Sequence, residues 1–387
     1  MLIAGPIRTR KFIQKYSPET ESHKMRTTTG ILRRIQGVES SSRGIVLISR
    51  NTLILCFVIL SGCGDSQDPI KPSLSKDLIP CIEASGVCSE SVQLGLQSFL
   101  PILRTHSLDR GDPQVQTAII IVHGTTRNHS SNFKTMILAV QQKDPSLNET
   151  IVIAPKFQIA EDSPTANEPF WTNSGWKKGH LSVTDSKPRP RVSSYTAIEK
   201  IIEILSVEAR FPELREVIVT GHSAGGQVAH RFAAGSRAEE IFGHINIRYI
   251  VANPSTYLYL GPERLIDGNF SSPIRSECPE YDYWHYGLQD LNTYMRSISR
   301  EKIKDNLVAR NVTILIGDQD VGSYQLDVSC GANLQGETRF SRGQNLISYM
   351  DSLFPANNHT QKVVPGVSHS GKGMYTSPEG ISVLFPS

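Results

Sequence analysis

The stretch Glu216-Val217-Ile218-Val219-Thr220-Gly221-His222-Ser223-Ala224-Gly225 decides the fold class of this chain. Its first half is mostly β-branched and predicts a buried strand, and the Ala-rich run after it favours a helix. Ser223 therefore falls on a sharp turn from strand to helix, which holds a serine Oγ in a strained and exposed position. Gly221 and Gly225 lack the Cβ atoms that would collide across such a turn. The motif predicts a nucleophilic serine, and the N–H of Ala224 at the start of the helix is placed to donate to a developing oxyanion.

A second oxyanion donor is predicted after an earlier strand. Residues 117–122 form a continuous apolar run, which is typical of a parallel strand that is buried on both faces. The run ends in His123-Gly124-Thr125, where the glycine permits a close approach of the backbone. We expect the N–H of Thr125 to complete the oxyanion hole with Ala224, with Gly124 as the alternative donor.

The acid of a serine, acid and histidine order is predicted after another strand. Residues 312–316 form a buried-strand run, and Gly317-Asp318-Gln319-Asp320 follows it. Either carboxylate can orient a histidine. We favour Asp320, because an aspartate in the place of Asp318 commonly bonds its own backbone in a turn.

The general base is predicted near the C-terminus. A short strand at 362–364 is followed by Pro365-Gly366 and then by His369 in a Gly/Ser-rich loop. His369 is the candidate that takes the proton from Ser223 and returns it to the leaving group. His359 is the nearest rival, but it precedes this strand.

With these motifs the chain resembles the α/β-hydrolases of the serine esterase and lipase type, from Thr117 to the C-terminus. Residues 251–260 and 283–288 also resemble a little-characterised group of secreted or lipoprotein α/β-hydrolases. The resemblance implies an α/β fold with a mainly parallel central sheet, helices on both faces and a small insertion or lid. It also implies a catalytic triad of Ser223, Asp320 and His369, oxyanion donors Thr125 and Ala224, and no metal or organic cofactor.

Strand and helix patterns alternate along the predicted catalytic domain, residues 77–387, as in a parallel sheet covered on both faces. The expected strands are 117–122, 150–154, 216–220, 247–252, 312–316 and 362–364, and the expected helices lie near 131–143, 194–208, 224–235, 296–308 and 338–353. Two connections, about 157–192 and 257–293, are longer than such units need and are rich in aromatic residues. These aromatic residues either line a substrate pocket or lid, or form a satellite core beneath the loops.

Residues 1–62 are rich in Lys and Arg and end in a short apolar segment, which predicts a secretory signal. Leu60-Ser61-Gly62-Cys63 resembles a bacterial lipobox, so Cys63 is a candidate for lipidation, with residues 63–76 as a flexible tether to a membrane. The leader is longer than such signals usually are, and a signal anchor or a buried strand is the alternative. We expect an exported protein of the bacterial cell envelope, on the periplasmic or outer side, or otherwise a secreted one.

The cysteines and the charge fit this location. If Cys56 leaves with the signal and Cys63 is lipidated, four of the 6 cysteines remain. We favour the pairs Cys81–Cys88 and Cys278–Cys330, since the first is local and the second links an insertion to the loop after the acid. None has the spacing of a metal site. The chain has a formal net charge of +3, but the basic excess lies in the leader, so no nucleic-acid partner is expected.

The sequence predicts a serine hydrolase that cleaves a carboxylic ester, small or polymeric, through an acyl-enzyme intermediate. An amidase or peptidase with the same triad is the first alternative, and a non-catalytic binding lipoprotein on the same scaffold is the second.

Overall fold

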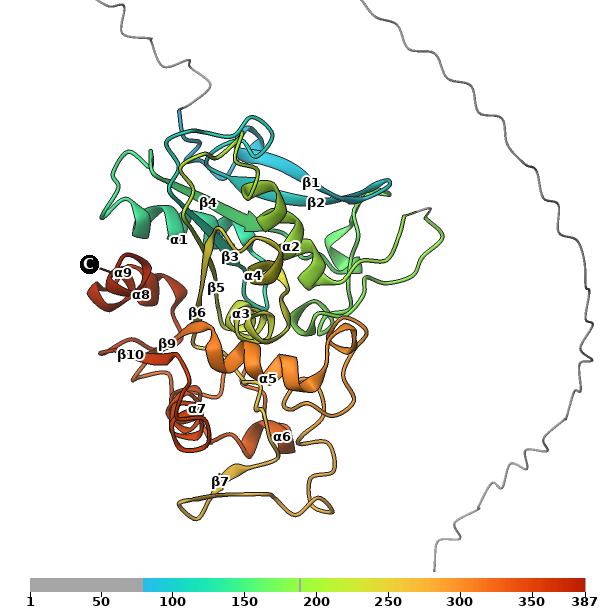
Figure 1. The fold of residues 1–387 in the computed structure, drawn as a ribbon, viewed down its shortest axis with the longest axis vertical. Coiled ribbons are helices and arrows are strands. Elements are labelled where there is room, and N and C mark those ends of the chain that lie inside the picture. Colours follow the sequence, from blue (N-terminus) through green and yellow to red (C-terminus); the bar gives the residue numbers. More distant parts are fainter. Residues whose placement is uncertain (1–78, 188, 387) are drawn as a thin grey trace, which may run out of the picture. The chain divides into compact units, whose positions relative to one another are not determined.

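Eight strands form the central sheet in the part of the chain that the structure describes. The computed structural model describes residues 79–187 and 189–386, so the predicted leader, the tether and Cys63 lie outside the described residues. The strand order is β1-β2-β4-β3-β5-β6-β9-β10 (Figure 1). All neighbours from β4 to β10 pair in parallel, whereas β2 is antiparallel to both β1 and β4. The strands are β1 (Ser89–Gly95), β2 (Ser98–Arg104), β3 (Thr117–Val122), β4 (Thr150–Pro155), β5 (Glu216–His222), β6 (Asn246–Ala252), β9 (Asn311–Gly317) and β10 (His359–Val364).

Helices cover both faces of this sheet (Figure 1). One face packs against α1 (His129–Val140), α8 (Gly371–Tyr375) and α9 (Pro378–Leu384). The other packs against α2 (Ser194–Leu205), α3 (Ala224–Gly235), α5 (Arg300–Ala309) and α7 (Arg339–Leu353). Two short helices, α4 (Ala238–Ile241) and α6 (Cys330–Asn333), and a small hairpin of β7 (Arg264–Ile266) and β8 (Asn269–Ser271) lie in the connections. None of the helices in the described ranges is long and apolar enough to cross a lipid bilayer.

Alternation along the strands explains why two layers of helices form. In β3, Ala118, Ile120 and Val122 belong to one apolar cluster, and Ile119 and Ile121 belong to the other. All five side chains are fully buried. Because successive side chains of a strand point to opposite faces, a strand that is apolar at every position needs cover on both sides.

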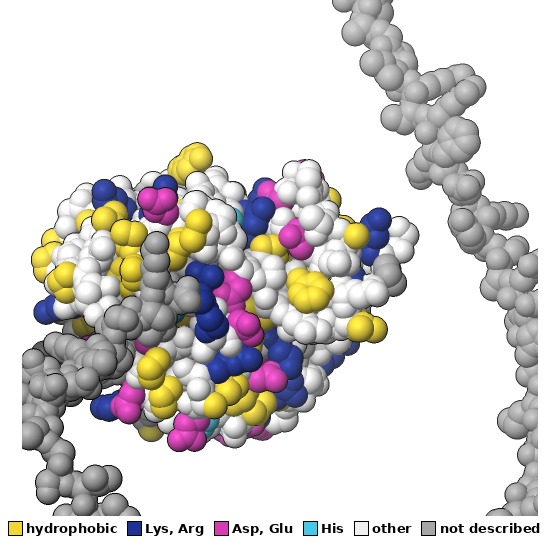
Figure 2. Space-filling model, turned by 90° about the horizontal axis from the view of Figure 1, so that it is seen from above, with side chains coloured by type: hydrophobic (Ala, Val, Ile, Leu, Met, Phe, Trp, Pro, Cys, Tyr) yellow, Lys and Arg dark blue, Asp and Glu magenta, His cyan; other side chains and the backbone are white. Residues whose placement is uncertain are grey.

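The expected α/β architecture with a mainly parallel sheet is confirmed, and the six expected strands are present with small shifts at their ends. The antiparallel hairpin of β1 and β2 was not expected. Strand β1 is an edge strand with few buried side chains, and β2 contains Pro101, which pairs with Ser91. A proline inside an apolar run argues against a strand from sequence alone, but the sheet accepts it next to an edge. Figure 2, viewed from the β1–β2 end, shows acidic and basic side chains interspersed, with hydrophobic ones among them.

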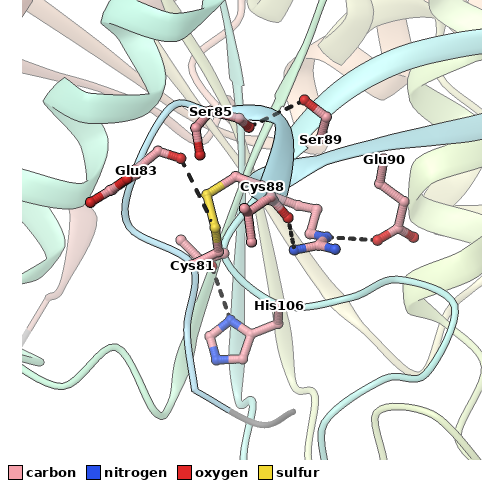
Figure 3. The surroundings of a disulfide bond; sticks show 10 residues. Cys81, Glu83, Ser85, Cys88, Ser89, Glu90 and His106 are labelled. Carbon is pink, nitrogen blue, oxygen red and sulfur yellow. Dashed lines mark hydrogen bonds and ion pairs between the residues drawn. A yellow bond between two sulfur atoms is a disulfide. The ribbon is translucent and has the colours of Figure 1, made fainter. Parts of the chain in front are cut away.

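Two disulfides join the four described cysteines in the pairs that the spacing favoured. The bond between Cys81 and Cys88 closes a loop before β1 (Figure 3). Cys81 N donates to Thr105 O at 2.7 Å, and Arg104 at the end of β2 forms an ion pair with Glu90 at 2.7 Å. These contacts fix the start of the described chain to the antiparallel edge of the sheet.

The two long connections are packed against the domain. The first runs from β4 to α2 and contains the 3₁₀ turns η3 (Ala160–Asp162) and η4 (Trp176–Lys178), and the second runs from β6 to α5. Trp171, Trp176, Tyr257 and Tyr259 are almost fully buried in the main apolar cluster. These four side chains are therefore part of the main core, and they form neither a substrate pocket nor a separate satellite core, whereas Trp284 is only partly buried.

Candidate active site

Ser223 occupies the turn between β5 and α3 in a strained conformation. Its φ is 59° and its ψ is −117°, a combination of backbone angles that residues other than glycine rarely adopt. The backbone N–H of Ser223 donates to Ala252 O, at the end of the neighbouring strand β6, at 2.9 Å. The sharp turn that the motif predicts is therefore present and is tied to the sheet.

Three glycines make this turn possible, because side chains at their positions would meet backbone atoms. A Cβ on Gly225 would lie 2.1 Å from Val122 O, and one on Gly221 would lie 2.5 Å from the carbonyl carbon of Gly225. A Cβ on Gly226 would lie 2.7 Å from Ala252 O. Helix α3 thus begins in contact with both strands that flank β5, which no larger residue would permit.

His369 and Asp320 are brought together although they are far apart in the sequence. The Nδ1 atom of His369 and the Oδ2 atom of Asp320 are 2.7 Å apart, and the carboxylate is 1% exposed. An ionised carboxylate only accepts hydrogen bonds, so we assign the proton to Nδ1, which leaves Nε2 free to accept. Asp318 makes a different contact, since its Oδ1 accepts from the N–H of Gly366 at 2.8 Å.

Arg339 is a buried neighbour of Asp320 that no sequence pattern indicated. Its Nη1 lies 3.4 Å from Asp320 Oδ1, and its Nη2 donates to Tyr324 O at 2.8 Å. Burial lowers the pKa of Arg339, and Asp320 counteracts this effect. The guanidinium thus holds Asp320 on the side away from His369.

Asn253 links the strand that precedes the acid to the loop that carries the histidine. It follows β6, is fully buried and has a φ of 42°. Its Oδ1 accepts from Gly317 N at 2.9 Å, and its Nδ2 donates to Ser368 O at 3.3 Å. Gly317 ends β9, and Ser368 precedes His369, so a single amide holds both loops.

His123 holds the loop after β3. Its Nε2 accepts from Phe157 N at 3.0 Å, so its Nδ1 carries the proton and donates to Gly124 O at 3.0 Å. Burial lowers the pKa of His123 to about 3, which keeps the ring neutral. The ring centroid of Trp176 lies 4.7 Å from that of His123. Gly124 lies beside Ser223, since a Cβ on Gly124 would lie 3.9 Å from Ser223 Cβ, so the hydrogen bond from His123 holds the loop at this point.

The same loop is held from its other end by Arg127. This side chain donates to Thr125 O at 3.1 Å and binds both carboxylate oxygens of Asp162, at 2.6 and 3.2 Å. Within residues 79–187 and 189–386, the N–H groups of Thr125 and Ala224 donate to no protein acceptor.

His222 lies directly beside the candidate base. The ring centroids of His222 and His369 are 4.5 Å apart. Burial, with the nearby His369 and Arg339, lowers the pKa of His222 well below its usual value. A neutral His222 adds no like charge when His369 takes up a proton.

Many solved structures share the fold of this chain. Neither a protein-family model nor a curated protein sequence matches the chain. Poly(aspartic acid) hydrolase-1 from Sphingomonas sp. KT-1 matches 75% of this chain and 96% of its own, with 21% identity and a TM-score of 0.53. LpqC, a poly(3-hydroxybutyrate) depolymerase from Bordetella parapertussis, matches 77% of this chain and 90% of its own, with 19% identity and a TM-score of 0.53.

The chain has the α/β-hydrolase fold. In the α/β-hydrolase fold, as in other open parallel sheets, ligands bind outside the carboxyl ends of the strands. Ser223, Asp320 and His369 follow β5, β9 and β10 and therefore lie at this edge. His359 begins β10 at the opposite edge, so it is separated from the other candidates.

The sequence did not predict that His123 and Asn253 hold the site loops, although each residue follows a buried strand directly. A polar residue at the carboxyl end of a parallel strand is the signal that could have found them. Arg339 begins α7 and carries no comparable signal. Among the described residues, no three His, Cys, Asp or Glu side chains are grouped as metal ligands.

Proposed function

We propose that this protein is a serine hydrolase that cleaves carboxylic esters through an acyl-enzyme intermediate. The observation that carries the proposal is the hydrogen bond between His369 and Asp320, at the edge of the sheet where the strained Ser223 turn lies. The contact of Asp318 with Gly366 supports Asp320 as the acid. An imidazole whose Nδ1–H is bound to a buried carboxylate offers Nε2 as a base.

In the proposed reaction the Oγ of Ser223 attacks the ester carbonyl, and its proton passes to Nε2 of His369. The N–H groups of Thr125 and Ala224 stabilise the oxyanion of the tetrahedral intermediate. The imidazolium of His369 then protonates the leaving alcohol. Water, deprotonated by His369, attacks the acyl-enzyme and releases the acid and free Ser223.

Comparison of p-nitrophenyl hexanoate hydrolysis by the purified protein and by Ser223→Ala tests this function. We expect the mutant to lose activity by several orders of magnitude, on the order of 10⁶-fold in kcat. Ser146→Ala removes an exposed serine between α1 and β4 and serves as the control. A fluorophosphonate probe is expected to label the protein and Ser146→Ala but not Ser223→Ala.

Two results would contradict the proposal: activity that survives in Ser223→Ala, or a folded protein that neither hydrolyses the ester nor reacts with the probe. Faster cleavage of a matched p-nitroanilide than of the ester would favour the amidase alternative.

We also propose that the protein is exported and anchored through a lipid on Cys63. The two disulfides support an extracytoplasmic location, since such bonds persist in oxidising compartments. Mass spectrometry of the N-terminal peptide from membrane fractions tests the anchor. An unmodified Cys63 in the mature protein would exclude it.

A further inference from the structure

The 3₁₀ turn η4 (Trp176–Lys178), here called the lysine turn, lies between the predicted oxyanion loop and helix α3. Trp176 packs on His123, which holds Gly124. On the other side, Arg231 of α3 donates through Nη1 to Lys177 O at 3.3 Å. The turn therefore connects two of the elements that surround Ser223.

Helix α3 leads from Ser223 to this turn. Residues four apart lie on one side of a helix, so Gln227 and Arg231 continue the side that starts at Ser223. Gln227 N donates to Ser223 O at 3.1 Å, and Arg231 Nη1 donates to Gln227 Oε1 at 3.0 Å. With a rise of about 1.5 Å per residue, Arg231 begins roughly 12 Å along the helix from Ser223.

Every carbonyl of the lysine turn accepts a hydrogen bond. Ser194 Oγ donates to Trp176 O at 2.8 Å, and Tyr195 OH joins Arg231 on Lys177 O. Lys178 O accepts from two side chains of the second long connection, the indole of Trp284 at 2.9 Å and the amide of Asn292 at 2.5 Å. The backbone of the turn is thus held in one position by α2, by α3 and by the second long connection.

The two lysine side chains, in contrast, have no partner among the described residues. Within the described ranges, Lys177 and Lys178 form no ion pair and no side-chain hydrogen bond, although both are half-buried. Arg231 is fully buried and binds only uncharged groups, among them Thr256 Oγ1 at 2.8 Å. Three cations therefore lie together, and no carboxylate in the described part of the chain is in contact with them.

The electrostatics of this cluster agree with its geometry. Burial, followed by the charge of Arg231, lowers the pKa of both lysines, that of Lys178 to about 8. Asp327 is the one described carboxylate that raises either pKa, and its own oxygens are bound by Tyr286 OH at 2.6 Å and Ser329 N at 3.0 Å. Arg127, on the oxyanion loop, also acts on Lys177. Half-buried cations of one sign are costly unless an anion compensates them.

We propose that Lys177 and Lys178 bind a carboxylate of the substrate, so that the preferred ester carries a negative charge several atoms from the scissile bond. This inference rests on the proposed ester hydrolysis. The substrate class is the monoester of a dicarboxylic acid, or an ester with the acid group in its alcohol part. Hydrolysis of such a monoester consumes one water and releases the alcohol and the dicarboxylate.

Two esters of equal length test this inference. The mono-p-nitrophenyl ester of adipic acid carries a carboxylate where p-nitrophenyl hexanoate has a methyl group. We expect the protein to have a higher kcat/KM for the adipate ester than for the hexanoate ester. We expect Lys177→Gln/Lys178→Gln to lower the ratio of kcat/KM for the adipate ester to that for the hexanoate ester by about tenfold or more. The control Lys134→Gln/Lys143→Gln makes the same charge change at exposed positions on or just after α1 and is expected to leave the ratio unchanged.

The outcomes separate this inference from the function on which it rests. If Ser223→Ala abolishes hydrolysis of both esters but the wild-type ratio of the two kcat/KM values is near one, the ester hydrolase stands and the carboxylate site is refuted. The same conclusion follows if this ratio is equal in the wild-type protein and in Lys177→Gln/Lys178→Gln. If neither ester is cleaved, the proposed function itself fails. Free adipate gives a measurement that needs no variant: it should inhibit hexanoate ester hydrolysis more strongly than free hexanoate does, and equal inhibition would also refute the site.

Discussion

Replacement of Asn253 by alanine is expected to destabilise the protein and to displace the candidate base. The side chain is fully buried and makes two hydrogen bonds, to Gly317 N at 2.9 Å and to Ser368 O at 3.3 Å. Asn253→Ala leaves the N–H of Gly317 without a partner and removes one of the two hydrogen bonds that Ser368 O accepts, the other coming from Ser370 N at 2.8 Å. It also forces alanine into a left-handed conformation, since φ is 42°.

The expected loss of stability follows from these three changes. An unpaired buried Gly317 N–H costs about 1–3 kcal/mol, and the longer bond to Ser368 contributes about 0.5–1.5 kcal/mol. The left-handed backbone adds about 1 kcal/mol for alanine. The sum, about 2.5–5.5 kcal/mol, is a large part of the roughly 5–15 kcal/mol that stabilises a typical domain.

Urea denaturation followed by tryptophan fluorescence measures this loss. Asn253→Gly keeps the backbone conformation and should recover about 1 kcal/mol, which separates the backbone effect from the hydrogen bonds. Asp267→Ala, at an exposed position with a φ of 49°, is a control for the backbone effect alone. A displaced histidine loop should also lower kcat by roughly 10²-fold in the fraction that remains folded. If Asn253→Ala loses no more stability than Asp267→Ala, the argument from the buried amide is refuted.

Three further changes test the site. Asp320→Asn should lower kcat by about 10³–10⁴-fold in ester assays, because asparagine favours the wrong tautomer of His369. Asp318→Asn keeps an acceptor for Gly366 N and should lower kcat by less than about tenfold. Equal losses of kcat in the two variants would reject Asp320 as the acid. Gly225→Ala places a Cβ 2.1 Å from a backbone oxygen. We therefore expect loss of soluble protein or a fall of the melting temperature by more than about 10 °C. An unchanged melting curve would contradict the steric explanation. Burial and the charge of Arg231 lower the pKa of Lys178 to about 8, so Lys178 loses its charge as the pH rises through about 8. The preference for the adipate ester over the hexanoate ester should decline over the same pH range. If the ratio of the two kcat/KM values stays constant from about pH 7 to pH 9, a charged Lys178 is excluded as the cause of the preference.

Local steric and packing rules made the framework predictable from the sequence. The glycines around Ser223 are required wherever a helix begins against two neighbouring strands, and the structure has backbone atoms 2.1 to 2.7 Å from the missing Cβ positions. Apolar runs such as 117–122 need cover on both faces, so a mainly parallel sheet between two helix layers follows from them. The edge hairpin was missed because its few buried positions and Pro101 give no strand pattern.

Only the tertiary structure decided which polar groups meet. The sequence favoured Asp320 because Asp318 was expected to bond its own turn, but Asp318 instead binds Gly366 N. The different partners of the two carboxylates arise because β9 and β10 are neighbours and bring the loop with Gly366 and His369 beside them. The unpaired state of Lys177 and Lys178 likewise depends on what the two long connections and α3 place around them. Neighbours along the chain determine backbone conformation and burial pattern, whereas the partner of a side chain depends on contacts between segments far apart in sequence.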